Sequence, residues 1–187
     1  MIPPFRAPKT IALVGLMGVG KTSIGRRLAQ RLELPFADAD AEIEAAAGTS
    51  IEEIFQRHGE AAFRDGERRV MARLLDAPPR VLAAGGGAFM DASTRALLRS
   101  RAITVWLRAD LEVMLARVSR RNNRPLLKAG DPRAVLERLI AERYPVYAEA
   151  DFTVDSIDGP PDATVERVIA ALASQGNTAI DPARSAS

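Results

Sequence analysis

The octapeptide Gly-Leu-Met-Gly-Val-Gly-Lys-Thr at residues 15–22 constrains the fold of this chain more than any other segment. It follows an apolar, β-branched run, Thr10–Val14, and precedes a helical pattern, Ser23–Leu32. A strand, a glycine-rich turn and a helix in this order are the context in which such a sequence forms a phosphate-binding loop. A plain strand-to-helix turn needs one glycine and no Lys-Thr pair. The segment therefore predicts binding of a nucleoside triphosphate.

The residue types of this loop suit phosphate chemistry. Its glycines allow positive φ angles and bring backbone N–H groups close to phosphate oxygens. The following helix points the positive end of its dipole at the same anion. We expect Lys21 to reach the β- and γ-phosphates and the Thr22 hydroxyl to ligate Mg²⁺. The expected nucleotide contacts in this segment are Gly15, Gly18, Val19, Gly20, Lys21, Thr22 and Ser23.

Length and composition bound the domain organisation. The 187 residues are expected to form one domain at 10–174, with an irregular lead-in at 1–9 and a disordered tail at 175–187. The absence of cysteine excludes disulfides and thiolate metal sites. A net charge of only +2 and the lack of an aromatic stacking series disfavour nucleic acid as a partner. No apolar run reaches transmembrane length and the N-terminus lacks an apolar signal-peptide region, so we expect a cytoplasmic protein without a membrane partner. We also expect it to be a monomer.

Short apolar runs alternate with longer helical patterns along the chain. This alternation predicts βαβ units, and therefore an α/β fold in which helices cover both faces of a parallel sheet. Runs that are apolar throughout suit strands buried on both sides. The five expected strands are Thr10–Val14, Leu34–Ala37, Val81–Ala84, Ile103–Leu107 and Phe152–Val154.

Capping residues mark where several helices begin. Ser50-Ile51-Glu52-Glu53 is a capping box and predicts a short helix that ends near Gly59, after which Glu60–Asp76 forms a second helix. Aspartates at cap positions and prolines at helix starts predict the later helices. These signals are Asp91, Asp110, Asp131 before Pro132, and Pro160-Pro161 before the last helix.

Two aspartates, Asp38 and Asp40, follow the second expected strand. In an extended chain a spacing of two puts both carboxylates on one face. One of them could hold Mg²⁺ while the other accepts a proton from a substrate hydroxyl. Alternatively, Asp40 only caps the helix Ala41–Ala47 and Asp38 is solvated. The pair alone favours neither interpretation.

Three consecutive glycines, Gly85-Gly86-Gly87, follow the third expected strand. They permit close approach of the backbone to a ligand, whereas a flexible turn would account for only one or two of them. No apolar strand of this chain ends in the aspartate that many phosphate-loop proteins use for magnesium. The metal-binding role therefore shifts toward Thr22 and Asp38.

A cation-rich segment from Arg120 to Asp131 connects two expected helices and contains Arg124. In a kinase such a segment can close over the nucleotide and bring an arginine to the transferring phosphoryl group. In a chain whose cations are almost all arginines, a solvated loop has the same composition. This segment alone favours the solvated loop.

Two separated arginines, Arg64 and Arg143, suit recognition of a small acidic substrate. A guanidinium group pairs with a carboxylate through two parallel hydrogen bonds. Glu67 lies three residues after Arg64 on the same helix face and is expected to orient it. Ordinary ion pairs on a helix surface have the same sequence pattern.

Taken in order, these motifs resemble the shikimate kinase family. The resemblance runs from the strand before Gly15 to the final helix. The phosphate loop alone is shared by many families, so the later motifs carry the specificity. They are Phe36-x-Asp38-x-Asp40-x-x-Ile43-Glu44, Gly48-x-Ser50-Ile51-x-Glu53-Ile54-Phe55, Gly59-Glu60-x-x-Phe63-Arg64-x-x-Glu67, Gly85-Gly86-Gly87, Arg124-Pro125-Leu126-Leu127 and Arg143-x-Pro145-x-Tyr147.

The resemblance implies a P-loop kinase domain with a mobile lid over about 120–131. It implies that ATP phosphorylates the 3-hydroxyl of shikimate, with Mg²⁺, on the route to chorismate and the aromatic amino acids. The implied catalytic residues are Asp40 as base, with Lys21 and Arg124 at the transferring phosphoryl group. Further implied contacts are Thr22 and Asp38 to Mg²⁺; Asp40, Arg64, Arg143, Gly85, Gly86 and Gly87 to the substrate; and Arg124, either Arg117 or Arg120, and the segment Ser156–Pro160 to ATP.

Two rival interpretations stay open at this stage. Another small-metabolite kinase, such as a gluconate or nucleoside monophosphate kinase, would share the phosphate loop. Gluconate is also a hydroxylated acid, so the ordered motifs discriminate better than the chemistry does. A nucleotide-dependent switch would account for the loop but would leave Asp40, Arg64 and Arg143 without a shared purpose.

Overall fold

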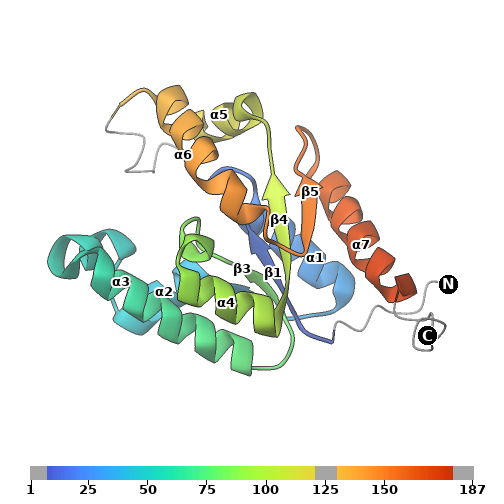
Figure 1. Ribbon diagram of the computed structural model, residues 1–187, viewed down its shortest axis with the longest axis horizontal. Coiled ribbons are helices and arrows are strands. Elements are labelled where there is room, and N and C mark those ends of the chain that lie inside the picture. Colours follow the sequence, from blue (N-terminus) through green and yellow to red (C-terminus); the bar gives the residue numbers. More distant parts are fainter. Residues whose placement is uncertain (1–7, 121–129, 179–187) are drawn as a thin grey trace, which may run out of the picture.

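The central sheet has five parallel strands in the order β2-β3-β1-β4-β5 (Figure 1). The computed structural model describes residues 8–120 and 130–178, and side chains up to residue 174. The expected α/β architecture with a parallel sheet is confirmed. The strands are β1 Thr10–Val14, β2 Phe36–Asp38, β3 Val81–Ala83, β4 Ala102–Arg108 and β5 Phe152–Asp155.

Helices cover both faces of this sheet, as expected (Figure 1). The helices α1 and α7 pack against each other on one face, whereas α4 packs on the other face with α3 outside it. In chain order they are α1 Lys21–Leu32, α2 Ala39–Ala47, α3 Ile51–Asp76, the 3-10 helix η1 Ala88–Met90, α4 Ala92–Arg101, α5 Leu111–Ser119, α6 Pro132–Tyr147 and α7 Pro161–Thr178.

The second strand starts two residues later than Leu34, where the sequence predicted it. The Leu34 N–H donates to the carbonyl of Ala29 at 2.9 Å, so it closes the end of α1. Glu33 adopts a left-handed conformation there, with a φ of 54°. This C-terminal cap occupies the backbone that would otherwise begin the strand.

Most of the expected helix starts are present. The Ser50 hydroxyl accepts a bond from the Glu53 N–H at 3.2 Å, and the carboxylates of Asp91 and Asp131 cap α4 and α6. Asp110 occupies the cap position of α5 but makes no side-chain capping bond.

The element α3 consists of two helices that meet at Gly59, as the sequence predicted. Gly59 itself has a non-helical φ of 78° and ψ of 176°, which places a kink there. At the other end of the chain, α7 continues to Thr178, beyond Gln175 where a tail was expected. Polar residues signal a lack of burial, not a lack of helix, so the composition of this segment did not reveal the extra turn.

Parallel register brings the carboxyl ends of three strands to one edge of the sheet. Ala83 at the end of β3 lies opposite Leu13 of β1 on one side and Asp38 of β2 on the other. The loops that follow these strands therefore leave the sheet side by side, as expected for a ligand site in an open parallel sheet. None of the helices in the described ranges is long and apolar enough to cross a membrane.

Candidate active site

A pocket of about 1000 Å³ opens where β1, β2 and β3 end. It brings together most of the residues singled out from the sequence. Gly15 and Val19 belong to the same loop but do not line the pocket, and Arg124 lies outside the described residues. The expected residues that line it are Gly18, Gly20, Lys21, Thr22, Ser23, Asp38, Asp40, Arg64, Gly85, Gly86, Gly87, Arg117, Arg120 and Arg143.

The phosphate loop has the backbone that its glycines predict. Gly15, Gly18 and Gly20 have φ angles of 145°, 82° and 94°. A Cβ atom at Gly15 would lie 2.6 Å from the carbonyl oxygen of Leu107, so only glycine fits between β1 and β4 at this point. The Lys21 amino group donates to the carbonyl oxygens of Gly15 and Leu16 at 2.7 and 3.0 Å. These bonds hold the lysine over the loop to which it belongs.

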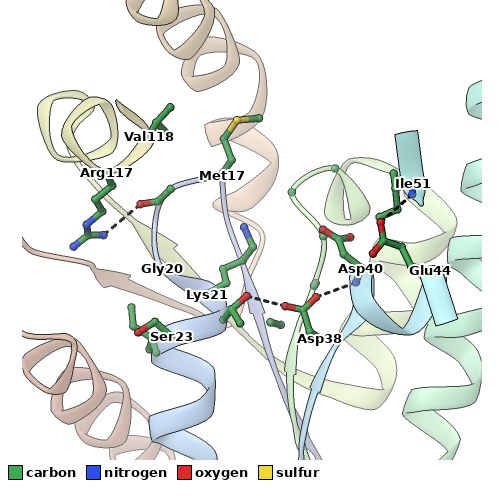
Figure 2. A pocket seen from close by; sticks show the side chains of 18 of the residues that line it. Met17, Gly20, Lys21, Ser23, Asp38, Asp40, Glu44, Ile51, Arg117 and Val118 are labelled. Atoms are coloured by element: carbon green, nitrogen blue, oxygen red, sulfur yellow. Dashed lines mark hydrogen bonds between the residues drawn. The ribbon is translucent and has the colours of Figure 1, made fainter. Parts of the chain in front are cut away.

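Asp38 ends β2 and caps α2, so it connects the sheet to the second helix. Its carboxylate accepts bonds from the N–H groups of Asp40 and Ala41 at 3.1 and 3.4 Å. The prediction that Asp38 and Asp40 share one face of an extended strand is wrong, because Asp40 already lies in the first turn of α2. The alternative in which Asp40 caps the helix is wrong as well, since Asp38 performs that role. Figure 2 shows both aspartates turned toward Lys21.

Thr22 and Asp38 form the one pair of oxygen ligands that the sequence assigned to Mg²⁺. The Thr22 hydroxyl donates to Asp38 Oδ2 at 2.7 Å, and both side chains are half-buried beside the loop. Mg²⁺ is typically bound through one or two protein oxygens, with phosphate and water as its remaining ligands. The pair fits that pattern. Among the described residues there is no group of three or more His, Cys, Asp or Glu side chains that could hold a metal ion.

Gly85 makes room for Asp40. A Cβ atom at Gly85 would lie 2.6 Å from Asp40 Oδ1 and 3.4 Å from Glu67 Oε2. A side chain at this position would displace one of the two carboxylates. The first of the three glycines therefore lets α2 and α3 bring both acids up to the end of β3.

Arg64 and Glu67 form an ion pair, as the sequence predicted. Arg64 Nη1 donates to Glu67 Oε1 at 2.7 Å, and Glu67 is only 1% exposed. The second oxygen, Oε2, is buried without a hydrogen-bond partner among the described residues. Burial raises the pKa of Glu67, and the bond and charge of Arg64 oppose that rise. Gly87 leaves space for the pair, because a Cβ atom there would lie 2.5 Å from Arg64 Nη2.

Arg143 reaches the glycine loop from α6. It lies near the end of α6, and its Nη1 donates to the Gly86 carbonyl at 2.9 Å. The Tyr147 hydroxyl donates to the same carbonyl. The structure therefore places Arg143 beside Gly86 and Arg64 beside Gly87, where the sequence predicted a site for an acid.

Arg117 anchors the phosphate loop to the segment after β5. Its guanidinium donates to the carbonyl oxygen of Val19 at 3.1 Å, to Ser156 Oγ at 2.9 Å and to the carbonyl oxygen of Ile157 at 2.6 Å. Burial lowers the pKa of Arg117. Arg120 lies exposed at the end of α5 and also lines the pocket. Of the two arginines, Arg117 contacts the segment Ser156–Pro160 that was expected to complete the adenine pocket.

Several apolar residues of the pocket had no predicted role. Ile51, Phe55 and Phe63 project into it from α3, and the rings of Phe55 and Phe63 lie 4.6 Å apart. Phe55 is 38% exposed, which is unusual for a side chain of this size. The spacing of four residues between Ile51 and Phe55 indicates a core stripe in sequence, so only the structure reveals that this stripe faces the pocket.

The comparisons with known proteins agree along almost the whole chain. The shikimate kinase family model matches residues 17–173. The shikimate kinase of Paramagnetospirillum magneticum is 60% identical over 167 residues, which cover 89% of this chain and 86% of the relative. That of Caulobacter vibrioides is 61% identical over 171 residues, covering 91% and 85%.

A solved structure supports the same assignment. Shikimate kinase from Acinetobacter baumannii in complex with shikimate superposes with a TM-score of 0.85 at 39% identity, covering 89% of this chain and 94% of that one. Sequence, fold and the family model therefore agree over the same residues. The chain belongs to the shikimate kinase family.

Proposed function

We propose that this kinase transfers the γ-phosphoryl group of ATP to the 3-hydroxyl of shikimate, which gives shikimate 3-phosphate and ADP for chorismate and aromatic amino acid synthesis. The observation that carries the proposal is the presence of Lys21, Asp40, Arg64 and Arg143 around one pocket. Phosphoryl transfer to a hydroxylated acid requires a phosphate site, a carboxylate base and cationic groups for the acid, and this pocket contains all three. Family membership favours shikimate over gluconate as that acid.

Arg64 and Arg143 recognise the substrate carboxylate in this proposal. Arg64 lines the pocket, and its Nη1 is held by Glu67 at 2.7 Å. Arg143 approaches from α6 beside Gly86. The backbone N–H groups of the loop Gly85–Gly87 add donors for the same anion. Convergent donors from two helices and one loop suit a planar carboxylate.

Asp40 is the proposed general base. Its carboxylate lies in the first turn of α2, beside the end of β3 and turned toward Lys21 (Figure 2). There it orients the reacting hydroxyl and accepts its proton as the new bond to phosphorus forms. Lys21 stabilises the charge that spreads over the γ-phosphoryl oxygens. We assign the same task to Arg124, which lies outside the described residues.

Mg²⁺ is the proposed metal, bound with ATP. Thr22 and Asp38 would hold it, and when bound it neutralises charge on the β- and γ-phosphates. Arg117 or Arg120 packs on the adenine ring together with the segment Ser156–Pro160. Its position favours Arg117 over Arg120 for this role, because Arg117 already donates hydrogen bonds to Ser156 and Ile157 beside the phosphate loop.

One chain supplies every group that this mechanism uses, so a monomer suffices for activity. The cytoplasm is the compartment we assign to it, because ATP is the co-substrate. Light scattering of the purified chain at assay concentration tests the monomer. A dimer whose dissociation abolishes activity would contradict it.

The experiment that tests the function is ADP release with Mg-ATP, comparing shikimate, gluconate, AMP and no acceptor. Turnover that depends on shikimate and yields shikimate 3-phosphate is the expected result. Turnover on gluconate or AMP would keep the phosphate site but overturn the acid assignment. Nucleotide hydrolysis that no acceptor stimulates would instead favour a switch.

A further inference from the structure

Two side chains from one helix donate to a single backbone oxygen in the glycine loop. Arg143 and Tyr147 are four residues apart on α6 and therefore lie on one face. Arg143 Nη1 and the Tyr147 hydroxyl both donate to the Gly86 carbonyl. Arg143 is half-buried beside the pocket, whereas Tyr147 has no exposed surface.

We propose that Tyr147 is a positioning residue for substrate binding, because it holds the Gly86–Gly87 peptide in place when Arg143 turns to the substrate carboxylate. This inference rests on the proposed function of Arg143. Of the two side chains that donate to the Gly86 carbonyl, only Arg143 is also assigned to the substrate carboxylate. Tyr147 does not line the pocket, so its hydroxyl has the backbone oxygen as its partner whether or not the acid is bound.

The geometry of the peptide explains why this bond matters to the acid. The chain has no cis peptide bond among the described residues, so the Gly87 N–H points away from the Gly86 carbonyl across a planar unit. A donor that fixes the direction of the carbonyl also fixes the direction of this N–H. Gly87 lies against Arg64, where a Cβ atom would come within 2.5 Å of Nη2. The orientation of the peptide therefore sets the direction in which the Gly87 N–H group points beside Arg64.

Packing holds the Tyr147 ring without help from its hydroxyl. The ring lies 6.2 Å from Phe89 and 5.9 Å from Trp106, measured between ring centroids. Burial raises the pKa of Tyr147, and the charge and hydrogen bond of Arg143 oppose that rise; because the pKa stays above its ordinary value, the hydroxyl keeps its proton at neutral pH. Replacement by phenylalanine thus removes one donor and leaves the ring in place.

Tyr144 provides a matched control on the same helix. Its hydroxyl also donates to a backbone carbonyl, that of Ala109, at 2.9 Å. Its ring also packs on Trp106, edge-on at 4.8 Å between centroids. Tyr144→Phe therefore deletes a comparable bond and retains a comparable ring contact, but it leaves Gly86 untouched.

The test measures KM and kcat of wild type, Tyr147→Phe and Tyr144→Phe with shikimate, with thermal unfolding as a check on folding. We expect Tyr147→Phe to raise the KM for shikimate roughly 5- to 100-fold, the cost of leaving a buried carbonyl without its donor. The KM for ATP and the melting temperature should match those of Tyr144→Phe. Equal KM values for shikimate in the two variants would overturn the inference.

An acceptor analogue with a hydroxymethyl group in place of the carboxylate separates this inference from the function on which it rests. Wild type should bind the acid more tightly than the alcohol, and Tyr147→Phe should lose much of that difference. If wild type binds both equally, the role of Arg143 and the present inference both fail. If wild type discriminates and Tyr147→Phe discriminates as well as Tyr144→Phe does, only the role of Tyr147 fails.

Discussion

The Thr22 hydroxyl donates a hydrogen bond of 2.7 Å to Asp38, although the two residues begin different helices. Thr22 is the last residue of the phosphate loop and lies in the first turn of α1. Asp38 is the N-cap of α2 and has its carboxylate shared between that helix and Thr22. The bond therefore couples the phosphate loop to the helix that carries Asp40.

Asp38→Asn separates metal binding from helix capping. Asparagine caps a helix as well as aspartate does, so α2 should remain folded. The lost charge should raise the Mg²⁺ concentration for half-maximal activity about 10-fold or more. Titrating activity with Mg²⁺ at constant free ATP measures this shift. Asp91→Asn, which changes the matching cap of α4, should leave the Mg²⁺ dependence as in wild type.

Asp40→Asn removes the proposed base. We expect the turnover number to fall about 10²- to 10⁴-fold, because no other group takes the hydroxyl proton, while the affinity for ATP is retained. Calorimetric titration with a non-hydrolysable ATP analogue checks the affinity. Glu42→Gln on the same helix is the control, since Glu42 pairs with Arg73 outside the pocket at 2.8 Å. Near-normal turnover of Asp40→Asn would rule out the base assignment.

Arg143→Lys keeps the positive charge but replaces the planar fork with a single ammonium group. The KM for shikimate should rise roughly 10- to 100-fold, as expected for loss of one charge-assisted hydrogen bond, and the KM for ATP should change much less. Steady-state kinetics with each substrate varied in turn measures both values. Arg133→Lys at the start of α6, where Arg133 pairs with Glu112, is the matched control. Equal effects on both substrates would contradict recognition of the carboxylate.

Glu67 should make stability depend on pH. Burial raises its pKa above the ordinary value of 4.5, so the folded chain binds the proton more tightly than the unfolded chain does. This contribution to stability is fully present below about pH 4.5 and is lost as the pH rises through the raised pKa. Glu67→Gln cannot titrate. Wild type should therefore lose stability relative to Glu67→Gln as the pH rises.

Urea unfolding of both chains at about pH 4.5, 6 and 7.5 measures this difference. Glu60→Gln is the control, because Glu60 also faces Arg64, at 3.7 Å, but is exposed. A stability difference between wild type and Glu67→Gln that stays constant over this range would show that Glu67 does not titrate there.

The parts of the fold that local sequence dictates were predictable. The phosphate loop is a contiguous motif between a strand and a helix, and its glycines have the positive φ angles expected. Arg64 and Glu67 pair because they are three residues apart on one helix. Alternating strands and helices fixed the parallel sheet, since βαβ units leave few other arrangements.

Other features depend on contacts that no local pattern carries. Gly86 and Tyr147 are 61 residues apart in sequence, and their hydrogen bond exists only because α6 returns to the end of β3. Asp38, rather than Asp40, caps α2 because β2 ends at Asp38, and strand ends are set by pairing with β3. The position of this boundary decides which of the two aspartates caps the helix.

The pairing of β1 with β3 has a consequence for how this enzyme can diverge. Leu13 lies opposite Ala83, so the backbone bonds of the sheet set the separation between the phosphate loop and the glycine loop. The site for ATP, the phosphoryl donor, and the site for the acid, the phosphoryl acceptor, are therefore two separate parts of the pocket held by one sheet. Substitutions in α2 and α3 can alter which acid is accepted. Meanwhile β1, α1 and Arg117 continue to bind the same nucleotide. Selection for a new substrate can act on one half of the pocket without rebuilding the other.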